Sequence, residues 1–168
     1  MTEEKLFSAL LKEKIPFVLI GGTALAAYGS ARITIDTDIA VKTLDLNRII
    51  GLFYSLGLKM VIGVDKNQYP LFAESGSAAV DFSDQTDWGF LKFLSGDLEL
   101  DVLYDIPVPF LRLLQDACIS KVFGIEIKTA SLLHLRLMKE KVIKAREDPG
   151  KRRLDEIDLA FINRKLTE

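Results

Sequence analysis

The sequence predicts a mixed α/β fold, because segments with the apolar patterns of helices and of strands alternate along the chain. Three observations carry this prediction. An apolar run, two glycines and a helix-forming segment follow one another over residues 17–28, strand-like segments fill residues 58–105, and two consecutive helices are predicted after residue 131. We expect one domain, residues 1–168, with an α/β core over 1–130 and a C-terminal helical pair over 131–168.

The first half of the chain is predicted to alternate helix and strand. Thr2 is a suitable N-cap for the first helix, and Pro16 ends that helix and begins a buried strand. Gly29 ends the second helix and Gly57 the third. The expected elements are a helix over residues 2–14, a strand over 17–20, a helix over 23–28, a strand over 32–41 and a helix over 44–56.

The second half is predicted to form antiparallel strands and then helices. Polar turns such as Ser95-Gly96-Asp97 separate the strands, Gly124 is the turn of a small hairpin, and Ser131 is a suitable cap for a long helix. The expected elements are strands over 58–64, 69–73, 78–82, 88–94 and 98–104, a helix over 107–120, a hairpin over 121–128, and helices over 132–147 and 151–165.

The composition is typical of a globular protein. Of its residues 49% are hydrophobic and 27% charged, and the net charge of −2 gives no support to broad nucleic-acid binding, although a local basic face is compatible with it. The only cysteine, Cys118, excludes an intramolecular disulfide; we expect it to be buried and the protein to be cytoplasmic. We expect no membrane association, since the most apolar window, residues 15–28, is too short to cross a bilayer.

Gly21-Gly22 and the pair Asp36 and Asp38 are the main candidates for a site. Glycines between a strand and a helix allow the backbone to approach a phosphate closely. Asp36 and Asp38 point the same way, because side chains in a strand alternate between its faces. Two such carboxylates, with substrate phosphates, are typical ligands of Mg²⁺. Taken singly, the glycines fit an ordinary turn and the aspartates an exposed strand edge; their combination favours a site.

At these residues the chain resembles the nucleotidyltransferase superfamily with the DNA polymerase beta-like fold. The family's pattern is a hydrophobic residue, Gly, Gly or Ser, and then an Asp-x-Asp pair with apolar neighbours, which Ile20-Gly21-Gly22 and Asp36-Thr37-Asp38-Ile39 match. The longer form GG…YG…R-x-T-x-D-x-D resembles most the small, toxin-related (abortive-infection type) bacterial branch. Gly22 stands where many relatives carry Ser, so only a backbone N–H is available there for phosphate.

The resemblance implies a twisted mixed sheet with packed helices, and a metal-dependent transfer of a nucleoside monophosphate from a nucleoside triphosphate to a hydroxyl. Asp36, Asp38 and Asp101 would be the catalytic residues and would hold one or two Mg²⁺ (or Mn²⁺) ions. Asp101 would be the third carboxylate, on a neighbouring strand. Alternatively, Asp101 faces solvent in an alternating strand, and Asp81 is the competing candidate for the third ligand. Nucleotide binding would involve Gly21, Gly22, Arg32 and Lys139.

Charged residues on the apolar stripes of the last two helices have two interpretations. The stripe of the first helix includes Lys139 and Arg146, and that of the second includes Asp158. Asp158 pairs structurally with Lys139 or Arg146 in one interpretation. In the other, Lys139 holds phosphate at the edge of the site, because toxin-related members carry an L-x-x-x-K helix followed by D-x-x-D. His134 falls off the stripe and is predicted to be exposed.

Three functions remain open at this point. The resemblance favours a nucleotidyltransferase that binds a nucleoside triphosphate. Its acceptor would be an RNA end such as that of a tRNA, a protein or a small molecule. An antitoxin would be a further partner. Gly22 in place of Ser supports a rival, a catalytically inactive nucleotide-binding or interaction module on the same fold. A metal-dependent phosphohydrolase fits less well, since the chain has a single histidine and no His-rich ligand set.

Overall fold

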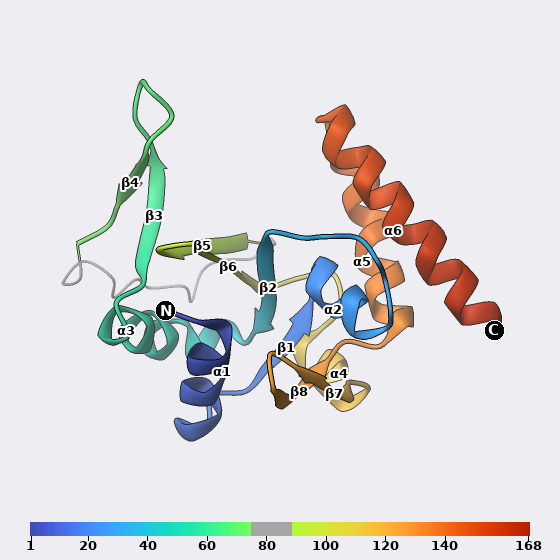
Figure 1. Cartoon of the computed structure of the whole chain (residues 1–168), viewed down its shortest axis with the longest axis horizontal. Coiled ribbons are helices and arrows are strands. Elements are labelled where there is room, and N and C mark those ends of the chain that lie inside the picture. The colour runs from blue at the N-terminus through green and yellow to red at the C-terminus, as the bar shows by residue number, and fades with distance from the viewer. Residues whose placement is uncertain (75–88) are drawn as a thin grey trace.

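A computed structural model describes residues 1–74 and 89–168, and within these residues the strands form one mixed sheet in the order β4-β3-β5-β6-β2-β1-β8-β7 (Figure 1). The strands are β1 (Phe17–Ile20), β2 (Asp36–Val41), β3 (Lys59–Val64), β4 (Pro70–Phe72), β5 (Gly89–Ser95), β6 (Leu98–Tyr104), β7 (Cys118–Val122) and β8 (Ile125–Thr129). The helices are α1 (Glu3–Lys12), α2 (Gly21–Ala27), the 3-10 turn η1 (Thr43–Asp45), α3 (Leu46–Ser55), α4 (Phe110–Gln115), α5 (Leu132–Ala145) and α6 (Pro149–Thr167). This confirms the predicted mixed α/β class.

Strand β2 lies in the middle of the sheet and has partners of both directions. It pairs antiparallel with β1 and parallel with β6. β5 pairs antiparallel with β6 and with β3, which continues antiparallel to β4. Because β2 and β6 run in the same direction, with Asp38 level with Asp101, both strands direct their carboxylates to one face of the sheet.

The other face of the sheet carries the apolar core. Along β6, residues alternate between buried and partly exposed, and the buried ones are all apolar apart from the tyrosine hydroxyl at the end. α1 and α3 lie on the same side of the sheet in Figure 1 and contribute their apolar stripes to this core. Phe53 of α3 packs edge-to-face on Phe93 of β5, with 5.0 Å between ring centroids. The carboxylates lie on the opposite face, called the open face below, where Asp36, Asp38 and Asp101 are partly exposed.

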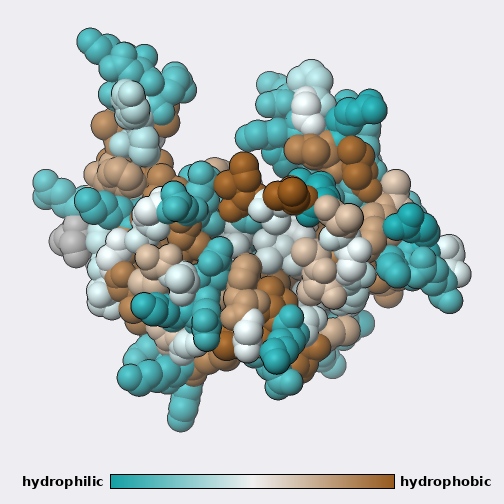
Figure 2. All heavy atoms as spheres, in the orientation of Figure 1, coloured by the Kyte–Doolittle hydropathy of each residue, from teal (hydrophilic) through white to brown (hydrophobic). Residues whose placement is uncertain are grey.

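The β3–β4 hairpin and the α5–α6 pair stand at opposite ends of the molecule in Figure 1, and both rise in the same direction. The space-filling view shows a hollow between these two projections (Figure 2). β2 begins at the side of the sheet from which both of them rise, so its first residue, Asp36, is at that side. In residues 1–74 and 89–168, none of the helices combines the length and apolar character that crossing a membrane requires.

Several predicted elements occur where the sequence pattern placed them. The strands over 17–20 and 98–104 have the predicted bounds. Thr2 caps α1 by accepting from the Lys5 N–H, and Ser131 caps α5 by accepting from the His134 N–H. The predicted strand over 78–82 lies outside the residues that the structure describes.

Two elements differ from prediction. The predicted helix over 107–120 is wrong in its second half: α4 ends at Gln115, and Cys118–Val122 forms β7, the edge strand paired with β8. The strand predicted from Arg32 begins only at Asp36. Residues 30–35 form a loop in which Ile33 and Ile35 are 89% and 80% exposed. The run of β-branched residues that predicted a strand here is therefore not buried in the sheet.

The predictions for His134 and Cys118 are both wrong. His134 is buried, 8% exposed, with its Nε2 3.5 Å from an Asp116 carboxylate oxygen. Asp116, the residue at the C-terminal end of α4, contacts His134, and the helical period of α5 cannot report a contact with such a distant segment. Cys118 is exposed because it lies on the edge strand β7.

Candidate active site

Three aspartates converge on the open face of the sheet. One carboxylate oxygen from each of Asp36, Asp38 and Asp101 lies within 4.8 Å of the others. The parallel pairing of β2 and β6 produces this arrangement, since it sets Asp38 directly beside Asp101 and Asp36 beside Glu99. The structure thus brings Asp101 to the Asp36–Asp38 pair; Asp81, its competitor, lies outside the described residues.

Asp38 is the most electrostatically strained member of this cluster. Burial, followed by the negative charges of Asp36 and Asp101, raises the pKa of the Asp38 carboxyl from 3.8 to about 7, against the opposing effect of Lys139 and Lys92. Burial also raises the pKa of the Asp101 carboxyl. Repulsion among carboxylates is relieved when a cation lies between them. Three oxygen donors at this spacing suit a hard divalent cation such as Mg²⁺ or Mn²⁺.

Gly21 and Gly22 make room for the cluster. Gly21 has a φ of +67°, and a Cβ built on it would lie 1.9 Å from Asp38 Oδ2. A Cβ on Gly22 would lie 2.6 Å from an Arg32 guanidinium nitrogen and 3.0 Å from Thr34 Cβ. Both positions therefore require glycine for close approach, the first to the carboxylate of β2 and the second to the loop that precedes β2.

The loop before β2 is tied to the first aspartate. Thr34 donates a hydrogen bond of 2.8 Å from its hydroxyl to Asp36 Oδ1. Thr23 of α2 donates one of 3.2 Å to the Asp36 carbonyl oxygen. These two contacts fix the chain at the point where the loop becomes β2, and they hold the Asp36 carboxylate in one orientation.

Lys92 of β5 is a site residue that the sequence analysis missed. Its ammonium lies 3.0 Å from Asp101 Oδ1 and 3.3 Å from Glu99 Oε2. A signal for it was present, because Lys92 interrupts the apolar strand Phe90-Leu91-Lys92-Phe93-Leu94 in the same way that Asp101 interrupts β6. An isolated charge among apolar strand residues is a reason to search for a partner on the neighbouring strand.

Lys139 and Arg32 belong to a network of ion pairs beside the cluster. Lys139 Nζ lies 2.7 Å from Asp155 Oδ1 and 2.8 Å from Asp158 Oδ2, and Arg32 Nε lies 2.8 Å from Asp158 Oδ1. The structural pair between Lys139 and Asp158 is confirmed, whereas Arg146 pairs with Asp155, 3.1 Å away, and not with Asp158. Lys139 also lowers the pKa of the Asp38 carboxyl, so its charge acts on the aspartate cluster as well.

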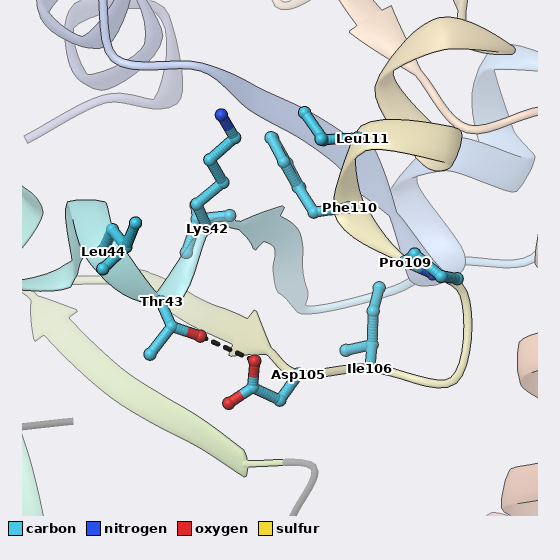
Figure 3. A pocket seen from close by; sticks show the side chains of 9 residues that line it. Lys42, Thr43, Leu44, Asp105, Ile106, Pro109, Phe110 and Leu111 are labelled. Atoms are coloured by element: carbon cyan, nitrogen blue, oxygen red, sulfur yellow. Dashed lines mark hydrogen bonds between the residues drawn. The ribbon is translucent and has the colours of Figure 1, made fainter. Parts of the chain in front are cut away.

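A pocket elsewhere in the structure contains none of the predicted site residues. It is lined by residues that follow β2 and β6, including Lys42, Thr43 and Asp105, and by Phe110 of α4 (Figure 3). Thr43 donates a hydrogen bond of 2.7 Å to Asp105 Oδ1 across it. The pocket lies at the C-terminal ends of β2 and β6, whereas Asp36 and Asp38 lie in the first half of β2 and Asp101 in the middle of β6.

Solved structures share this fold at low sequence identity. The structure of ANT(2")-Ia in complex with adenylyl-2"-tobramycin matches 97% of this chain and 86% of its own, with a TM-score of 0.64 at 15% identity. TM1012 from Thermotoga maritima, a proposed nucleotidyltransferase, matches 90% of this chain and 88% of its own, with a TM-score of 0.60 at 17% identity. An antigenic nucleotidyltransferase-like protein from Paracoccidioides brasiliensis matches 96% and 77%, with a TM-score of 0.52 at 16% identity.

No protein-family model matches the sequence, and no curated protein shows significant sequence similarity to it. The likeness is therefore one of structure: helices and strands over nearly the whole chain follow the arrangement of these proteins. The chain has the nucleotidyltransferase fold.

Proposed function

We propose that this protein is a metal-dependent nucleotidyltransferase, which moves a nucleoside monophosphate from a nucleoside triphosphate to an acceptor hydroxyl. The observation that carries the proposal is the convergence of Asp36, Asp38 and Asp101 within 4.8 Å on the open face of this fold. The triad lies beside the glycine turn Gly21-Gly22 and near two cations, Arg32 and Lys139, and this combination of groups supports the proposed reaction.

The three aspartates are the proposed metal ligands, because they are oxygen donors at a common point, and because burial, followed by the charges of Asp36 and Asp101, raises the pKa of the Asp38 carboxyl. A divalent cation bound there would clamp the triphosphate and lower the pKa of the acceptor hydroxyl. In the reaction the hydroxyl oxygen forms a bond to the α-phosphorus, the bond from that phosphorus to pyrophosphate breaks, and a carboxylate of the triad takes up the hydroxyl proton.

The triphosphate is proposed to bind between the glycine turn and the cations. Backbone N–H groups of Gly21 and Gly22 would contact phosphate, and Gly22, which lacks a hydroxyl, would contribute no side-chain contact. Arg32 and Lys139 would offset the charge on the leaving pyrophosphate. Both now pair with Asp158, so triphosphate binding would compete with, or share, these ion pairs.

The acceptor is the finer part of the proposal. ANT(2")-Ia binds adenylyl-2"-tobramycin, a ligand in which an aminoglycoside carries an adenylyl group, so aminoglycosides are the first small-molecule acceptors to test. RNA ends and proteins are the alternative acceptors. The pattern of Lys139 with Asp155 and Asp158 resembles that of toxin-related members, and it supports an antitoxin as a further partner.

The test is pyrophosphate release. The purified protein would be incubated with Mg²⁺ or Mn²⁺, each ribonucleoside triphosphate in turn, and aminoglycosides, total RNA or candidate proteins. We expect acceptor-dependent release with at least one triphosphate, and a loss of roughly 10³-fold or more in the Asp36→Asn and Asp38→Asn variants. Triphosphate binding without release under all these conditions would favour the inactive nucleotide-binding module, which Gly22 in place of Ser supports.

A further inference from the structure

Lys92 lies beside the aspartate cluster with its charge directed into it. In the strand register Lys92 is level with Asp101, which is level with Asp38, so three adjacent strands place these side chains in one row on the same face. The neighbouring row consists of Leu94, Glu99 and Asp36. The Lys92 ammonium bridges the two rows, 3.0 Å from Asp101 Oδ1 and 3.3 Å from Glu99 Oε2.

The Lys92 ammonium contacts Asp101, one of the three carboxylates that a second metal ion would have to share. A two-ion site for phosphoryl transfer needs ions about 3.5–4 Å apart that share carboxylates. Of the three aspartates, Asp36 and Asp38 come from one strand and Asp101 alone comes from the other, so an ion added next to Asp101 would share that carboxylate with Lys92. A lysine ammonium and a divalent ion on one carboxylate repel each other strongly in a partly buried site.

Lys92 is also poorly able to move away. Its side chain is 29% exposed, and the residues beside it in β5, Leu91 and Phe93, are packed on the core. If the Lys92 side chain left the site, its ammonium would lose its contacts with Asp101 and Glu99, and the negative charges of both carboxylates would no longer be compensated by it.

We propose that Lys92 is a built-in cation that takes the place of the second metal ion, so that the three aspartates bind a single divalent ion. The proposal rests on the proposed function, since it concerns the number of metal ions at that site. Lys92 is then a positioning residue that fixes the Asp101 carboxylate and balances the charge of the cluster. The site uses one metal ion and one lysine.

Mn²⁺ binding separates this role from a merely structural cross-strand pair. Lys121 of β7 provides the matched control, because it is level with Glu126 of β8 in an antiparallel pair and both are exposed, away from the aspartates. Wild type, Lys92→Met, Lys92→Arg and Lys121→Met would be titrated with Mn²⁺ in the presence of a non-hydrolysable triphosphate analogue. Bound Mn²⁺ would be counted by electron paramagnetic resonance.

We expect one Mn²⁺ per chain in wild type, Lys92→Arg and Lys121→Met, and two in Lys92→Met. Two ions in wild type, or one ion in Lys92→Met with unchanged affinity, would overturn the role of Lys92 while leaving a metal-dependent transferase intact. Absence of Mn²⁺ binding in every variant would overturn both the role of Lys92 and the proposed function. Lys92→Gln provides a second neutral variant should Lys92→Met not fold, and the wild-type count tests the proposal without any variant.

Discussion

Replacing Asp38 by asparagine should stabilise the metal-free protein at pH 8. The folded state raises the pKa of this carboxyl from 3.8 to about 7, so folding makes the ionised form costly. A shift of about 3 units at about 1.36 kcal/mol each gives an upper limit of about 4 kcal/mol. Because the effective dielectric constant even at buried sites is well above that of a dry interior, we expect a measured gain of about 2 kcal/mol. Asparagine has nearly the same shape and no charge.

The gain should depend on pH in a defined direction. A carboxyl whose pKa is raised on folding binds its proton more tightly in the folded state, so its contribution to stability is present below the unfolded pKa of 3.8 and is lost as the pH rises through about 7. Wild type therefore loses stability from this group between about pH 4 and pH 7, whereas the asparagine variant does not. The advantage of Asp38→Asn at pH 5 should be less than half of that at pH 8.

Urea unfolding at pH 5 and pH 8 with a chelator present measures both effects. Asp97→Asn, at an exposed turn between β5 and β6, is the control and should change stability little at either pH. With saturating Mn²⁺ the order at pH 8 should reverse, because the ion stabilises wild type and Asp38→Asn has lost a ligand. Equal stability of wild type and Asp38→Asn at pH 8 without metal would refute the claim that the cluster is strained.

The remaining predictions concern the groups around the aspartates. Gly21→Ala should abolish Mn²⁺ binding, because its Cβ would meet Asp38, whereas Gly124→Ala, also at positive φ but with open space, should cost only about 1 kcal/mol and leave binding unchanged. Lys139→Met should lower the free energy of unfolding by about 3 kcal/mol in urea, since the two buried aspartates of α6, Asp155 and Asp158, each lose one of their two cations. Unchanged stability would mean that Arg146 and Arg32 alone compensate them. Lys141→Met, at an exposed position of the same helix, is its control. Arg32→Ala should weaken triphosphate binding about tenfold by calorimetry, and an unchanged affinity would remove Arg32 from the proposed site.

The sequence predicted well those elements whose pattern is local. Strand β6 has the predicted bounds because its first five residues alternate between apolar residues and the acidic Glu99 and Asp101, and a Ser-Gly-Asp turn precedes it. The close approach at Gly21 was predictable from a glycine placed directly after a buried strand. In both cases neighbouring residues alone determine which face is buried or which backbone conformation is possible.

The errors arise where burial depends on segments distant in the chain. His134 is buried and contacts the residue that ends α4, and Cys118 is exposed because its strand is at the sheet edge. The residues around each of them in the sequence indicate neither fact. Ile33 and Ile35 have a strand-like pattern, but the strand that could pair with them is absent at that position in the described sheet, so they stay in a loop. Lys92 was missed for the same reason, because its partner lies on another strand.

The parallel pairing of β2 with β6 also has a consequence for how the protein assembles. The residues that meet there, Asp38 and Asp101, are separated by more than sixty positions in the chain, and β5 must hydrogen-bond to β6 on its other side. Contacts of such long sequence separation form late, after the entropy of closing the intervening loop has been overcome. A slip of one residue between these strands would exchange Asp101 for Leu100 or Val102 on the open face. The aspartates can therefore bind metal only after β2 and β6 have paired in the correct register. Mn²⁺ binding measured during refolding would report when this pairing forms.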